Sequence, residues 1–207
     1  SPDSDLFERP LAKRRARLEA VAKKFPKGGL IELSPATRDR AQAQRWLRTH
    51  GARDGVVAKL LDEPYRSGQR DAMVKIKRRR TADCVVGGFR YASSSKLVGS
   101  LLLGLYDRAG KLNHVGFMSG IRDAERRALT ARLEKLIQPP GFTGNAPGGP
   151  SRWSTERSEQ WEPLKPSLVV EVEFDHVTGD RFRHGTRLVR WRPDKKPRLC
   201  TMAQLRA

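Results

Sequence analysis

Paired cysteines and long apolar runs are both missing from this sequence of 207 residues. Its two cysteines, Cys84 and Cys200, have a spacing that matches neither a zinc site nor a disulfide framework. No apolar stretch approaches the roughly 20 residues of a membrane helix, and the first residues lack the hydrophobic segment of a signal peptide. These absences favour a soluble protein of a reducing, cytoplasmic compartment.

Acidic side chains are also scarce, with 23 Asp and Glu against 42 Lys and Arg, which gives a net charge of +19. The basic residues are spread along the chain instead of being collected in one tail. Such a chain attracts polyanions through phosphate contacts and counterion release, so we expect a nucleic acid as its partner. Ribosomal and chaperone-like basic proteins would share this charge. It therefore predicts a class of partner and not a reaction.

Two lysines, Lys75 and Lys77, stand two residues apart in a stretch that alternates with apolar residues. Side chains of a strand alternate between its faces, so both lysines should point the same way. Two neighbouring ammonium groups repel each other, and an anion between them, such as a nucleotide phosphate, would remove that cost. The alternative is a half-solvated strand whose lysines face water.

A second short apolar strand, residues 56–61, contains Lys59 and follows Asp54. A carboxylate at the start of this strand suits a divalent cation held near phosphates. The alternative is an ordinary turn aspartate before a glycine.

The first 80 residues predict helices and short strands. We expect helices over residues 11–25 and from Ser34 to near Gly51, and strands over 30–33, 56–61 and 72–77. Ser34 would cap the second helix and Pro35 would occupy its first turn.

Residues 81–207 predict five longer strands and one helix. The strands are expected at 84–91, 97–106, 111–118, 168–175 and 181–191, the helix at 122–137 and a mobile loop at 139–151. A helix between the third and fourth of five strands is the order of an OB-fold, a barrel that often binds nucleic acids, and the helix would plug one end of it. The prediction is thus an α+β chain with antiparallel strands and helices over 1–80 and a five-stranded OB-fold barrel over 81–207.

A charged segment near the end of the chain, RLVRWRPDK, places Arg190, Arg192, Asp194 and Lys195 around Trp191. Arginine pairs with phosphate oxygens through two parallel hydrogen bonds, and an aspartate there could orient a base or bind a metal. The alternative is a strand end followed by a solvated turn.

The histidines carry no metal signal. His50, His114, His176 and His184 show no zinc-ligand spacing, so we expect surface or hairpin positions for all four.

Four segments in order resemble the ATP-dependent DNA ligases, specifically the small bacterial type. DGVVAK looks like the fourth nucleotidyltransferase motif of that family, AMVKIKRRRTADCVVGGFR like the fifth motif running into the OB domain, and RHGTRLVRWRPDK like the sixth. PLAKRRARLEAV resembles the helix that follows the third motif. The resemblance implies that residues 1–80 are the back portion of a nucleotidyltransferase, or adenylation, domain.

The resemblance also implies site residues, with ATP and Mg²⁺ or Mn²⁺ as cofactors. Lys75 and Lys77 would act on the α-phosphate, and Lys59 would join them in binding the nucleotide. Asp54 would bind the metal ion. The remaining group, Arg192, Asp194 and Lys195, would close over the β- and γ-phosphates, with Asp194 also a metal ligand.

One family motif is missing, because no Lys-x-Asp-Gly sequence occurs in the chain. The lysine that would carry AMP is therefore absent, and we expect no self-adenylylation by this chain alone. The predicted activity is that of a ligase fragment that joins nicked double-stranded DNA in the bacterial nucleoid, with a separate polypeptide as one source of the front half. The alternative is a non-catalytic OB-fold module that binds DNA, and a relative of RNA-capping enzymes ranks third.

Overall fold

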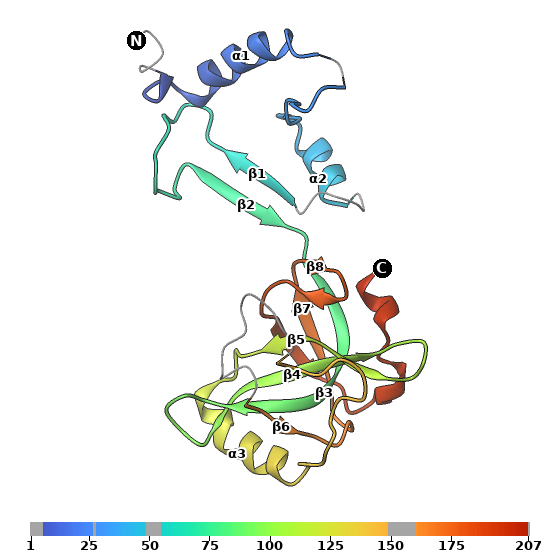
Figure 1. The fold of residues 1–207 in the computed structure, drawn as a ribbon. Coiled ribbons are helices and arrows are strands. Elements are labelled where there is room, and N and C mark those ends of the chain that lie inside the picture. The colour runs from blue at the N-terminus through green and yellow to red at the C-terminus, as the bar shows by residue number, and fades with distance from the viewer. Residues whose placement is uncertain (1–5, 27, 49–54, 149–159, 207) are drawn as a thin grey trace. The chain divides into compact units, whose positions relative to one another are not determined.

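The computed structural model of the chain describes residues 6–26, 28–48, 55–148 and 160–206 (Figure 1). The chain forms two compact units, Ser1–Arg78 and Arg79–Ala207, which we call unit 1 and unit 2. The division falls two residues before the boundary expected after residue 80.

The described residues of unit 1 form two helices and a two-stranded antiparallel ribbon. These are α1 (Leu11–Ala22), α2 (Arg40–Arg48), β1 (Gly55–Lys59) and β2 (Met73–Lys77). Backbone hydrogen bonds from Leu11 N to Glu63 O and from Tyr65 N to Phe7 O attach the start of α1 to the segment between the strands. Both predicted strands of the ribbon and the first helix are present.

The second helix begins six residues later than its predicted start at Ser34. Asp39 caps it, because its Oδ1 accepts a hydrogen bond of 2.8 Å from the backbone N–H of Ala41. The predicted strand at 30–33 is wrong, and the Leu30 side chain is fully exposed. The stretch before Asp39 contains apolar residues, but it pairs with no strand among the described residues, and Leu30 and Ile31 are exposed.

Apolar side chains of unit 1 remain in contact with solvent, and no residue that the structure describes between 6 and 78 is buried. The large apolar side chains left exposed in this unit are Phe7, Leu18, Val21, Leu30, Ile31, Val57, Leu60, Leu61, Tyr65, Met73, Val74 and Ile76. A two-stranded ribbon whose apolar side chains face solvent has only marginal stability in water.

Unit 2 is built on an antiparallel sheet with strand order β10-β7-β3-β4-β5. Its main elements are β3 (Arg80–Tyr91), β4 (Val98–Tyr106), β5 (Leu112–Met118), α3 (Asp123–Glu134), β7 (Val169–Phe174) and β10 (Arg187–Trp191). Shorter elements are β6 (Glu162–Pro163), β8 (Val177–Thr178), β9 (Arg181–Phe182), η2 (Pro197–Leu199) and η3 (Met202–Leu205). The predicted helix between the third and fourth long strands is confirmed.

The last predicted strand, 181–191, is divided into β9 and β10. β9 pairs with β8 in a small hairpin whose turn contains Gly179 at a φ of 60°, a conformation that glycine adopts without strain. A parallel bridge between Met118 and Thr186 links the two edge strands, and the Thr186 N–H donates to Phe117 O at 3.1 Å. A continuous ladder between these edges is absent from the described residues, so a closed barrel stays a prediction.

The core of unit 2 centres on β4, where Leu101, Leu102 and Leu103 are all fully buried. Successive strand residues face opposite sides, so both faces of this strand are covered. On one side Leu133 of α3 reaches the core, and Thr130 Oγ1 accepts a hydrogen bond from the Val98 N–H.

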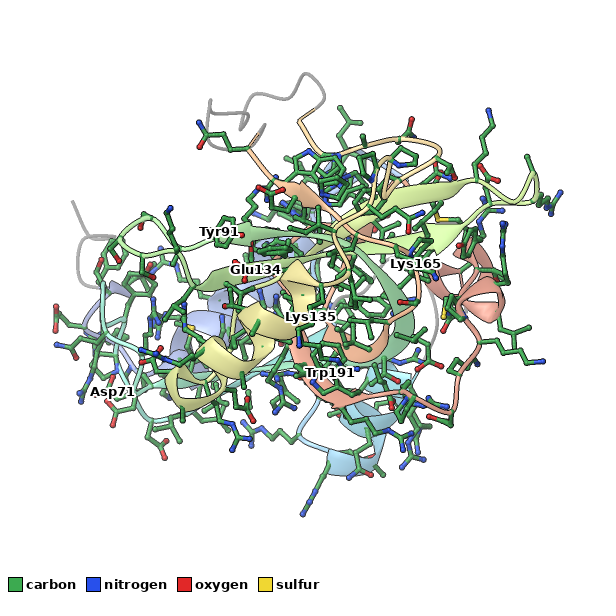
Figure 2. All side chains as sticks on the ribbon, turned by 90° about the horizontal axis from the view of Figure 1, so that it is seen from below. Asp71, Tyr91, Glu134, Lys135, Lys165 and Trp191 are labelled. Carbon is green, nitrogen blue, oxygen red and sulfur yellow. The ribbon has the colours of Figure 1, made fainter. Side chains whose placement is uncertain are left out.

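The helix α3 lies beside β6 at one end of the strands (Figure 1). Acidic residues in its first turn and Arg132 in its last turn suit the helix dipole. The Tyr91 hydroxyl of β3 donates to Glu134 Oε1 at 3.0 Å, and Figure 2 shows the two side chains next to each other. Arg126 of α3 donates to Val98 O at 3.2 Å.

The segment predicted as a mobile loop over 139–151 is packed where the structure describes it. Phe142 is part of the buried core, and the Thr143 and Gly144 N–H groups both donate to Leu112 O. Close packing against neighbouring strands accounts for two of its glycines, Gly141 beside Gly87 of β3 and Gly144 beside Asn113 of β5. Gly144 illustrates this, because a Cβ there would lie 2.3 Å from Asn113 Oδ1.

Candidate functional site

Three of the predicted site lysines lie on one face of the β1–β2 ribbon. The register pairs Lys75 with Val57, Lys77 with Gly55 and Lys59 with Met73. Directly opposed residues of an antiparallel pair share a face, as do residues two apart on one strand. The sequence-based expectation that Lys75 and Lys77 share a face is confirmed, and Lys59 joins them.

The other face of the ribbon is apolar. It consists of the opposed pairs Val56 and Ile76, and Ala58 and Val74. The Ile76 and Val74 side chains are 41% and 61% exposed. The ribbon thus presents three ammonium groups beside Val57 and Met73 on one side, and on the other only apolar side chains that are partly uncovered. Asp54, the predicted metal ligand before β1, lies outside the described residues.

A second cluster gathers the charged residues that follow β10. Arg192 Nε and Nη2 hold the Asp194 carboxylate, with distances of 3.0 Å to Oδ1 and 2.8 Å to Oδ2. Arg192 Nη1 donates to Asp83 Oδ1 at 2.8 Å, and Lys195 Nζ lies 3.3 Å from Asp83 Oδ2. The structure brings the predicted residues Arg192, Asp194 and Lys195 together around Asp83.

The sheet positions this cluster. β10 pairs with β7, and the Arg192 N–H donates to Val169 O just past the end of the strand. A turn follows, because the Lys195 N–H donates back to Arg192 O at 3.2 Å. Asp83 belongs to β3 and pairs with Glu171 of β7. Three neighbouring strands therefore fix the cluster.

The charges of the cluster stabilise one another. The hydrogen bonds from Arg192 lower the pKa of Asp194 to about 2, and the same contacts raise the pKa of Arg192. The hydrogen bond from Arg190 lowers the pKa of Glu171. These groups are charged at neutral pH, as a site that pairs cations with phosphate requires.

The metal ligands predicted from the sequence are not brought together by the described residues. Among those residues there is no group of three His, Cys, Asp or Glu side chains that could hold a metal ion. Asp194 is bound by Arg192 instead. Its role in metal binding stays a prediction.

Asp83 and its partner Gln204 are parts of this cluster that sequence reasoning missed. The Asp83 N–H donates to Gln204 Oε1 at 2.9 Å, and Gln204 Nε2 donates to Asp83 O at 3.0 Å. One signal was available: Asp83 interrupts an apolar strand, and a carboxylate at such a position needs a cationic partner.

His114 lies in β5 of the β4–β5 hairpin, one of the two kinds of position expected for the histidines, but it is buried instead of solvent-exposed. It is 5% exposed, and its Nδ1 lies 3.1 Å from Arg181 Nη2. Burial, with the neighbouring Arg181 and Arg90, lowers its pKa to about 3, so the ring is neutral at physiological pH. His184, by contrast, is exposed and pairs with Asp175.

Comparison with known proteins points to one family. Residues 94–195 match the family model described as the ATP dependent DNA ligase C terminal region. The chain is 43% identical to DNA ligase C2 of Mycolicibacterium smegmatis and 42% identical to DNA ligase C of Mycobacterium tuberculosis, each over 98% of this chain and 61% of the relative. The ligase domain of LigD from M. tuberculosis is structurally similar, with 33% identity and a TM-score of 0.51 over 93% of this chain and 60% of that one.

The fold and these matches define a C-terminal ligase region. The chain belongs to the ATP-dependent DNA ligase family, and it spans about 60% of the length of the relatives it matches. No helix in the described ranges is long and apolar enough to cross a membrane.

Proposed function

We propose that this chain is the part of an ATP-dependent DNA ligase that grips the phosphates of ATP and the DNA duplex. The enzyme would join nicked double-stranded DNA through lysyl-AMP and DNA-adenylate intermediates, in the bacterial nucleoid. The observation that carries the proposal is the shared face of Lys59, Lys75 and Lys77 in a chain that is 43% identical to a DNA ligase.

Residues 1–80 would form the back portion of the adenylation domain. Phosphoryl transfer depends on positioning the reacting groups and on cations placed where charge develops. Lys75 and Lys77 would act on the α-phosphate, with Lys59 beside them. The ammonium groups of one ribbon face fit a polyphosphate chemically.

The cluster after β10 would serve the other phosphates. Arg192 and Lys195 would bind the β- and γ-phosphates during adenylylation. A divalent metal ion, Mg²⁺ or Mn²⁺, would be held by Asp54 and Asp194 and would neutralise phosphate charge when bound. The carboxylate donors suit such an ion.

Residues 81–207 would form an OB-fold that binds nicked DNA. The basic composition of the chain supports this role, because phosphate contacts dominate the affinity of proteins for DNA. The Lys-x-Asp-Gly nucleophile, absent from the chain, would come from a segment or a separate polypeptide. Its attachment would cover the apolar face of the ribbon, where Val74 and Ile76 are exposed.

A nick-sealing assay tests the proposal. The 207-residue chain is mixed with the part of DNA ligase C2 that lies outside the matched 61%, together with ATP, Mg²⁺ and a nicked duplex. The matched part of DNA ligase C2 replaces our chain in the positive control. We expect sealing by the mixture and no covalent AMP on our chain alone.

Two results would contradict the proposal. One is a covalent AMP adduct on this chain alone with labelled ATP. The other is an unsealed nick in the mixture when the positive control seals it. In the second case, DNA binding that weakens steeply with salt would favour the alternative function, a non-catalytic DNA-binding module. The independent core of unit 2 is what supports that alternative.

A further inference from the structure

The two carboxylates that hold Arg192 differ in how firmly they are themselves held. Asp83 lies within the ladder between β3 and β7, and the Gln204 side chain clamps both its N–H and its C=O. Its side chain is 12% exposed. Each of its oxygens faces a different cation, Arg192 for Oδ1 and Lys195 for Oδ2. Asp83 is therefore a rigid anchor that sets the spacing of two positive charges.

Asp194 is the opposite kind of partner. Its side chain is 64% exposed and belongs to the turn after β10. It occupies the Nε and Nη2 edge of Arg192, which is the edge that pairs bidentately with a carboxylate or a phosphate. Asp194 is well solvated although the Arg192 side chain is only 17% exposed, so an incoming phosphate can replace this carboxylate and release it to water.

We propose that Asp83 is a positioning residue that holds Arg192 and Lys195 ready for a polyphosphate, and that Asp194 occupies the place of one phosphate group until the ligand arrives. This inference rests on the proposed function, since it takes the β- and γ-phosphates of ATP as the ligand. It adds an anchor, Asp83, and a second role for Asp194 to the residues predicted from the sequence.

The proposal gives the two carboxylates opposite effects on anion binding. Net charge alone predicts that neutralising either one strengthens binding of a polyphosphate, because a repelling negative charge is lost. Positioning predicts that neutralising Asp83 weakens binding, since Arg192 and Lys195 lose their fixed geometry. Neutralising Asp194 should strengthen it, since the paired edge of Arg192 becomes available.

Calorimetric titration of the full 207-residue chain with inorganic tripolyphosphate tests these signs. We expect Asp194→Asn to bind about 10-fold tighter than wild type and Asp83→Asn to bind about 10-fold weaker, each close to the lower end of what one charge-assisted hydrogen bond contributes. Asp123→Asn is the matched control for lost charge, because Asp123 is an exposed carboxylate in α3 that pairs with Arg126 at 2.8 Å. Its affinity should stay within about twofold of wild type.

A second variant guards against a folding defect in Asp83→Asn. Gln204→Ala removes the clamp on the Asp83 backbone without changing the charge of the chain. It should weaken tripolyphosphate binding in the same direction as Asp83→Asn. The ¹⁵N signals of the Arg192 guanidinium, recorded without ligand, should broaden or exchange faster in Asp83→Asn and in Gln204→Ala. In Asp194→Asn the Nη1 signal should stay as sharp as in wild type, because Asp83 still accepts the hydrogen bond from Nη1.

Tighter binding by Asp83→Asn would overturn the positioning role, and so would unchanged Arg192 signals in that variant. Absence of tripolyphosphate binding by both wild type and Asp194→Asn would overturn the proposed site. These outcomes are separate from failure of the proposed function, which is read from nick sealing in the reconstituted mixture.

Discussion

Unit 1 and unit 2 differ in where their apolar side chains lie. Every buried apolar residue that the structure describes belongs to unit 2, which encloses a continuous core around β4. Unit 1 carries three lysines on one ribbon face and leaves Val74 and Ile76 on the other face open. The comparison teaches that the buried core of this chain and the lysines proposed to act on the α-phosphate reside in different units. Unit 2 can stabilise itself, and unit 1 needs a covering surface.

The largest contrast should come from truncating one leucine in each unit. Leu103 is fully buried in β4, whereas Leu60, which follows β1, is 56% exposed. We expect Leu103→Ala to lower the free energy of unfolding by about 2–5 kcal/mol, because it removes buried methyl groups and leaves a cavity. Leu60→Ala should cost less than about 0.5 kcal/mol. Urea unfolding followed by tryptophan fluorescence measures both free energies. Equal losses in the two variants would contradict the difference between the units.

Backbone amide exchange rates should differ between the β1–β2 ribbon of unit 1 and the sheet of unit 2. Backbone amides of β1 and β2 should exchange at least about 100-fold faster than those of β4, because few buried contacts oppose local opening of the ribbon. Mass spectrometry of the exchanging chain measures this difference. Adding the unmatched part of DNA ligase C2 should slow exchange in the ribbon and leave β4 unchanged. Ribbon amides as slow as those of β4 in the chain alone would refute the need for a covering surface.

Acid should destabilise unit 2 through His114. Its pKa falls from 6.5 in the unfolded chain to about 3 in the fold, so the unfolded chain binds the proton first. The buried neutral ring makes its whole contribution to the free energy of unfolding above pH 6.5, and this contribution is lost as the pH falls toward 3. Between these limits wild type should lose about 1 kcal/mol per pH unit relative to His114→Gln. If the free energies of unfolding of the two proteins changed with pH in parallel, the lowered pKa of His114 would be contradicted.

The smallest effect should come from the hydrogen bond that attaches α3 to β3. Tyr91→Phe removes the hydroxyl that donates to Glu134 at 3.0 Å. Both side chains are partly solvated, so we expect a cost below about 1 kcal/mol in urea unfolding. Ser94→Ala, at an exposed position between β3 and β4, provides the baseline for a lost surface hydroxyl. A loss of several kcal/mol would mean that α3 depends on this bond more than on Leu133.

Local signals in the sequence were sufficient for much of the fold. Alternating or continuous apolar runs gave four of the five long strands, and the fifth is divided into β9 and β10. A periodic apolar stripe through Leu129 and Leu133 gave α3. The alternation around Lys75 and Lys77 gave their common face. These features depend on residues close together in the chain.

The features that sequence reasoning missed depend on residues far apart in the chain. Phe142 turned an apparently loose glycine-rich segment into part of the core. His114 is buried beside Arg181, which is 67 residues away in the chain. Asp83 meets Arg192 across 109 residues. Periodicity carries no information about such partners, although a carboxylate within an apolar strand could have signalled one.

The central claim, that Lys75 and Lys77 act on the phosphate of ATP, is tested most directly by the rate of lysyl-AMP formation in the reconstituted mixture. Removing a cation that stabilises developing phosphate charge should slow this step at least about 100-fold in Lys75→Ala and in Lys77→Ala. Lys96→Ala, at an exposed position between β3 and β4, should stay within about twofold of wild type. A wild-type rate in the Lys75 and Lys77 variants would contradict the claim.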